Sequence, residues 1–62
     1  MFSVNVETDN AAFGDAGQVR EAQAECARIV RTIGKELASG HLSGSIRDIN
    51  GNRVGTWELT AE

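Results

Sequence analysis

Residues 42–59, LSGSIRDINGNRVGTWEL, predict a β-hairpin that turns at the dipeptide Asn50-Gly51. Asn-Gly supplies the positive φ angles that a two-residue type I′ turn requires, and between alternating strand-like residues it is the strongest short-range hairpin signal. The register that follows pairs Ile49 with Asn52, Asp48 with Arg53, Ile46 with Gly55, Gly44 with Trp57 and Leu42 with Leu59.

This register separates an apolar face of the hairpin from a polar one. The apolar face holds Leu42, Ile46, Trp57 and Leu59. The other face holds Ser43, Ser45, Arg47, Thr56 and Glu58, with the apolar residues Ile49 and Val54 among them. We therefore expect a sheet that packs on one side and meets water on the other.

The first half of the chain predicts a strand and a long helix. Residues 2–7 alternate apolar and polar side chains, which is typical of a half-buried strand. Residues 16–39 place apolar side chains three and four positions apart, which is typical of one buried helical stripe. Asp15, with Gln18, is a candidate N-terminal cap, and Gly40 is the expected terminator.

The predicted fold is a single α+β domain over residues 1–62, in the order β-α-β-β. Its elements are strand 2–7, helix 16–39, strand 42–49 and strand 52–59. A crossover through the helix favours a three-stranded antiparallel sheet of order 1-3-2, covered on one face by the helix. The expected core is Phe2, Val4, Val6, Phe13, Val19, Ala22, Cys26, Ile29, Ile33, Leu37, Leu42, Ile46, Trp57 and Leu59. We expect Gly44 and Gly55 to make room for the indole of Trp57, and Gly34 to mark a close approach of the helix to the sheet.

Composition narrows the class of protein. The chain has 62 residues, one cysteine and a net charge of −3, which argues against bulk nucleic-acid binding and against a disulfide scaffold. The N-terminus has no basic segment followed by an apolar run, and no stretch approaches membrane-spanning length. We expect a soluble protein of a reducing cytoplasm.

No motif predicts catalysis, a metal or another cofactor. Residues 48–52 superficially resemble a calcium loop, but the glycine is misplaced and Leu59 stands where the bidentate glutamate is needed. A hairpin turn with an Asp48–Arg53 cross-strand pair explains the same residues better. Cys26 lies in the apolar stripe and is interpreted as a core residue, and His41 as a residue of the helix end. We therefore predict a protein that is not an enzyme.

Two surfaces are the main candidates for binding a partner; a third, the acidic loop around Glu7, Asp9, Asn10 and Asp15, has too few carboxylates to imitate nucleic-acid phosphates well. Arg28, Arg31 and Lys35 recur at helical spacing and form a basic stripe, although such a stripe is often only a solvated face. On the outer sheet face, Ile49 and Val54 lie near Arg47 and Arg53, and apolar residues beside arginine are typical of interface hot spots. Isolated surface apolar residues are equally common without any role.

Two motifs carry a resemblance to a known class of proteins. Thr8, Asp9, Asn10, Ala12 and Phe13 fit the pattern T-D-N-x-A-F. The pattern D-x-N-G-N-x-V-G-x-W is fitted by Asp48, Asn50, Gly51, Asn52, Val54, Gly55 and Trp57. Together they resemble small proteins of unassigned function encoded in tailed phages and prophages.

The resemblance implies a phage accessory protein acting in the cytoplasm of a bacterial host. Proteins of this size and setting often bind and block a host protein, including defence systems of the CRISPR-Cas or restriction type, and an anti-CRISPR-like inhibitor is the leading hypothesis. One alternative is nucleic-acid or nucleoprotein binding through the basic helix, and another is a structural, assembly or homodimeric phage protein. A membrane partner is not expected.

Overall fold

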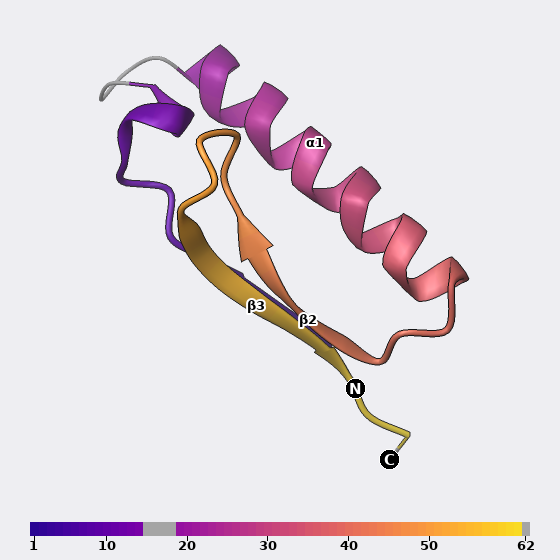
Figure 1. The fold of residues 1–62 in the computed structure, drawn as a ribbon. Helices are drawn as coiled ribbons and strands as arrows, with labels where there is room; N and C mark the ends of the chain where they lie inside the picture. The colour runs from indigo at the N-terminus through magenta and orange to yellow at the C-terminus, as the bar shows by residue number, and fades with distance from the viewer. Residues whose placement is uncertain (15–18, 62) are drawn as a thin grey trace.

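The chain folds as one helix against a three-stranded antiparallel sheet (Figure 1). The computed structural model describes residues 1–14 and 19–61. Its elements are β1 (Phe2–Val6), the 3₁₀ turn η1 (Ala11–Phe13), α1 (Val19–Ala38), β2 (Ser43–Arg47) and β3 (Arg53–Leu59). The strand order is β1-β3-β2, with both neighbouring pairs antiparallel. The predicted fold class and strand order are thus confirmed.

Most of the predicted hairpin register is confirmed. Gly44 lies opposite Trp57, and Ile46 lies opposite Gly55. A Cβ atom at Gly44 would lie 2.7 Å from the indole nitrogen of Trp57, so this glycine makes room for the ring as predicted. At Gly55, by contrast, the close neighbour is the backbone of Asn5 in β1, not the indole.

The register departs from the prediction next to the turn. Arg47 lies opposite Arg53, where Asp48 was expected, so that Val54 is an extra residue in β3 and forms a β-bulge. A bulge shifts the alternation of side chains by one residue. Val54 consequently turns inward and is only 8% exposed, so its predicted place on the outer face is wrong.

The turn itself is longer than the predicted two-residue type I′ turn. That turn needs a positive φ at both central residues, whereas Asn50 has a negative φ and only Gly51 has a positive one, at 87°. The Gly51 N–H donates to the Asp48 carbonyl, and the Asp48 N–H donates to the Asn52 carbonyl. The arrangement is that of a three-residue loop with a left-handed glycine at its end.

The core lies where α1, η1 and the hairpin meet. Its buried apolar residues are Phe13, Ile29, Ile33, Ile46, Val54 and Trp57. Val6, Ala12, Ala22, Cys26 and Leu37 are partly buried and pack against this cluster. Five predicted core residues are exposed instead: Phe2, Val4, Val19, Leu42 and Leu59. Most of them lie at the end of the sheet away from the hairpin turn, and α1 contacts the sheet mainly through β2.

The end of α1 is as predicted, but its interior glycine is not. Gly40 has a φ of 95°, and the His41 N–H donates to the carbonyl of Glu36 to close the helix. Gly34 is exposed, and a Cβ there would meet nothing within 4 Å, so the expected close approach to the sheet is wrong. The predicted cap at residues 15–18 lies outside the described residues. Within residues 1–14 and 19–61, no helix is both long and apolar enough to cross a membrane.

Candidate functional site

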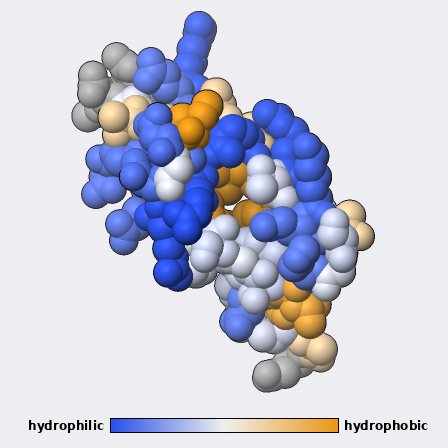
Figure 2. All heavy atoms as spheres, viewed as in Figure 1, coloured by the Kyte–Doolittle hydropathy of each residue, from blue (hydrophilic) through white to orange (hydrophobic). Residues whose placement is uncertain are grey.

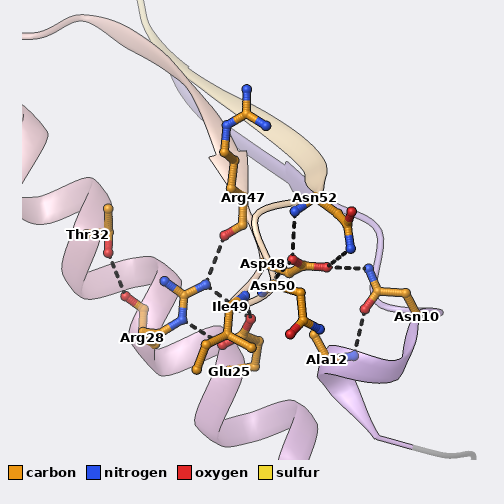
Figure 3. A network of polar contacts seen from close by, with 10 residues as sticks. All are labelled: Asn10, Ala12, Glu25, Arg28, Thr32, Arg47, Asp48, Ile49, Asn50 and Asn52. Carbon is orange, nitrogen blue, oxygen red and sulfur yellow. Dashed lines mark hydrogen bonds and ion pairs between the residues drawn. The ribbon is translucent and has the colours of Figure 1, made fainter.

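The carboxylate of Asp48 holds the hairpin loop together from inside (Figure 3). This side chain is buried, and Oδ1 accepts hydrogen bonds of 2.9 Å from the backbone N–H groups of both Asn50 and Asn52. Oδ2 accepts from the side-chain amides of Asn10, at 3.0 Å, and Asn52, at 3.2 Å. Asp48 is therefore a loop-organising residue and not the cross-strand partner of Arg53 that the sequence predicted.

Asn10 joins the first sequence motif to the second. Its amide nitrogen donates to Asp48, while its amide oxygen accepts from the Ala12 N–H at 2.9 Å and so caps η1. The turn η1 in turn places Phe13 in the core. One asparagine side chain thus couples the loop after β1 to the loop between β2 and β3 (Figure 3).

A second buried carboxylate, Glu25, ties helix α1 to the same hairpin loop. Oε1 and Oε2 of Glu25 accept from Nε and Nη2 of Arg28 at 2.7 and 3.1 Å. Oε2 also accepts from the Ile49 N–H at 2.8 Å. Arg28 Nη2 further donates to the carbonyl of Arg47 at 2.9 Å, which closes a bridge between α1 and the end of β2.

Both carboxyl groups are held in their ionised form. The hydrogen bond from Arg28 lowers the pKa of Glu25, outweighing the effect of burial, and the Ile49 N–H contributes in the same direction. Burial acts to raise the pKa of Asp48, but the hydrogen bonds from Asn52, Asn50 and Asn10 together outweigh it and lower that pKa. The same ion pair raises the pKa of Arg28. These shifts favour charged groups that are fully engaged in holding the loop.

The chemistry of this network is structural. In residues 1–14 and 19–61, each buried side-chain nitrogen or oxygen has at least one hydrogen-bond partner. The same described residues contain no group of three or more metal-ligating side chains. The arrangement can hold a surface in a fixed shape, and that surface is the candidate site.

The network presents Ile49 to solvent. Its backbone N–H is bonded to Glu25, yet its side chain is 69% exposed at the tip of the hairpin. Arg28 lies beside it on α1, and Ala12, Ala24, Glu21 and Glu25 also line the shallow depression next to the isoleucine. We call Ile49, Arg28 and Arg47 the tip surface.

The structure unites only part of the predicted binding set. Arg28 and Ile49 line the same depression, and Arg28 bonds to the backbone carbonyl of Arg47. The Arg47 guanidinium points away from both (Figure 3) and donates to the Gly51 carbonyl at 3.0 Å. Arg31 and Lys35 are exposed and continue from Arg28 along the same side of α1. Arg53 is exposed in β3 opposite Arg47. Val54 does not belong to this surface, because the β-bulge turns its side chain inward and buries it.

A small hollow lies next to the tip surface, between α1 and β2. It is lined by Arg28, Ile29, Thr32, Ile33, Glu36, Ser45, Ile46 and Arg47. Figure 2 shows mainly hydrophilic atoms on this face of the molecule, with small separate apolar areas, one of them in the hollow.

The sequence interpretation missed the two buried carboxylates. Glu25 lies four positions before the buried Ile29, and its place beside the apolar stripe was the one signal of its burial. For Asp48, the Asn-rich neighbourhood was a usable signal, because aspartate before a turn commonly accepts from the backbone two residues further on.

A comparison of the chain with protein-family models finds no match, and comparisons with curated proteins and with solved structures find none.

Proposed function

We propose that this chain is a non-enzymatic binding protein that covers and blocks a functional surface of a bacterial host protein. The observation that carries the proposal is the exposure of Ile49 on a loop whose backbone is fixed by Glu25 and Asp48. A loop whose backbone is already held in place loses less conformational entropy when its apolar side chain enters a partner's pocket. Arginine beside such an anchor adds directed hydrogen bonds.

Charge adds a preference for the kind of partner. The exposed cations Arg31 and Lys35 extend the tip surface along α1, so an acidic protein surface is the complementary one. The resemblance to phage accessory proteins is the basis for placing that partner in a bacterial host, and a defence protein of the CRISPR-Cas or restriction type is the target class it implies. Occlusion of such a surface requires no chemistry from this chain.

The test is affinity capture of the tagged protein from a bacterial host lysate, with and without nuclease, followed by the same capture with variants. Ile49→Glu and the pair Arg31→Glu with Lys35→Glu change the proposed contact. Val30→Glu is the matched control, because Val30 is 63% exposed on α1 and points away from Arg28. Arg28 itself is left unchanged, because it also holds the loop through Glu25.

A host protein captured in stoichiometric amount by the wild type and the Val30→Glu control, but lost with Ile49→Glu, is the expected result. Circular dichroism melts of each variant separate lost binding from lost folding. Capture that disappears with nuclease, or that weakens steeply with salt, indicates instead that the basic helix binds nucleic acid. Equal capture by all four proteins removes the tip surface from the binding site.

A further inference from the structure

Along β1, backbone groups that bond to β3 alternate with backbone groups that point outward from the sheet edge. Met1 and Thr60 exchange two backbone hydrogen bonds, each of 2.8 Å. At the other end of the strand, the Glu7 N–H donates to the Val54 carbonyl. In an antiparallel ladder the hydrogen-bonded residues alternate, so bonds at residues 1 and 7 mean that the N–H and C=O groups of residues 3 and 5 also point toward β3. The same groups of Phe2, Val4 and Val6 therefore point outward, at the edge where the described sheet ends.

The side chains at this edge are apolar and incompletely covered. Phe2 is 51% exposed and Val4 is 41% exposed, and both lie on the face that carries Trp57, because Val4 pairs with Trp57. Leu59 lies opposite Phe2 and continues the apolar row. Since α1 contacts the sheet mainly through β2, Phe2 and Val4 stay only partly covered.

Natural edge strands usually carry a device that prevents pairing with another chain. Typical devices are a charged side chain, a proline or a bulge in the strand. The sequence of β1, FSVNV, has neither a charge nor a proline, and its register against β3 is regular. A domain of this length also buries a small fraction of its surface and gains from further burial.

We propose that β1 pairs with β1 of a second copy of this chain. The pattern is self-complementary about Val4: in an antiparallel two-fold pair, Val4 faces Val4, and Phe2 of each copy faces Val6 of the other. These are the same three residues whose backbone groups point outward, so each of the three pairs would exchange two hydrogen bonds. The product is a continuous six-stranded sheet with both helices on one face and the exposed valines and phenylalanines brought together.

The test is the mass of the protein in solution as a function of concentration, by sedimentation equilibrium. We expect a rise from the monomer mass of 6.6 kDa toward twice that value. Val4→Lys places like charges directly opposite each other at the two-fold axis and should raise the dissociation constant at least about tenfold. Val30→Lys adds the same charge at an exposed valine of α1 and should leave the constant unchanged.

Amide hydrogen exchange on the wild type makes the test independent of whether Val4→Lys folds. The amides of Phe2, Val4 and Val6 should exchange slowly at concentrations where the dimer forms and quickly where it does not. A protein that stays monomeric up to millimolar concentration overturns the proposal. So does a dimer that forms equally with Val4→Lys and Val30→Lys, or one in which these three amides remain fast.

Discussion

The indole nitrogen of Trp57 donates a 2.9 Å hydrogen bond to Oε1 of Glu36, which ties the central strand to helix α1. Trp57 is also the most deeply buried side chain among the described residues. Its ring meets the edge of Phe2 at a centroid distance of 6.2 Å, at an interplanar angle of 67°. Three elements therefore depend on one side chain.

Replacing Trp57 with alanine should unfold the domain or nearly so. Loss of a large buried aromatic side chain costs about 3 to 5 kcal/mol, which is comparable to the total stability of so small a domain. A thermal melt followed by circular dichroism measures this. An unchanged melting temperature would show that the ring does not support the core.

The partner of the indole gives a finer test. Glu36→Gln keeps an oxygen acceptor for the Trp57 N–H and should change stability little. Glu36→Ala leaves that buried N–H without its acceptor and should cost about 1 to 3 kcal/mol. Urea unfolding of both variants separates the two effects, and equal stabilities would mean that the hydrogen bond is dispensable.

Substitutions at Asp48 should rank by the number of hydrogen bonds they remove. Asp48→Asn keeps one oxygen but turns an amide group toward other donors, so it should lower the melting temperature by several degrees. Asp48→Ala removes all four acceptor contacts and should lower it further. The opposite ranking, or no change in either variant, would contradict the role of Asp48 in the loop.

Acid should destabilise the protein through Glu25 and Asp48. Both have a folded-state pKa below the ordinary values of about 4.3 and about 3.9 for these side chains. Their contribution to stability is therefore complete above those ordinary values and is lost as the pH falls through the lower folded-state values. Melting temperatures measured from pH 7 downward should fall steeply below about pH 4. The double variant Glu25→Gln with Asp48→Asn should have a flatter profile, and an equally steep one would refute this assignment.

Two glycines should respond to alanine in opposite directions. Gly34 lies in the exposed interior of α1 with open space around it, so Gly34→Ala should stabilise the fold by about 1 kcal/mol. Gly51 also has open space, but its φ of 87° strains any other residue, so Gly51→Ala should destabilise the hairpin. The urea midpoint should rise above the wild-type value for Gly34→Ala and fall below it for Gly51→Ala.

The sequence was sufficient to predict the strand order, because the apolar periods and the Asn-Gly signal located the elements and a right-handed crossover through the helix favoured the order 1-3-2. It was not sufficient near the turn. The bulge shifts the register at Val54, and the bond from Asn10 to Asp48 joins residues far apart in the chain, which alternation of side chains does not predict. The exposure of Phe2 and Val4 has a similar origin, since the apolar alternation predicts which face they share but not how far the helix reaches.

The candidate site was predicted in the same incomplete way. Periodicity correctly grouped Arg28 with Arg31 and Lys35, and the hairpin placed Ile49 near Arg47. The rigid support under Ile49 could not be foreseen, because it rests on the burial of Glu25, a residue type that sequence patterns assign to solvent.

The position of the single tryptophan has a practical consequence for spectroscopy. The intrinsic fluorescence of this protein comes from one indole that is shielded from water and bonded across the strand–helix contact. Its emission should therefore shift to longer wavelength when α1 separates from the sheet. Agreement between that shift and the far-ultraviolet signal would show that helix and sheet unfold in one cooperative step, without any label being added to the chain.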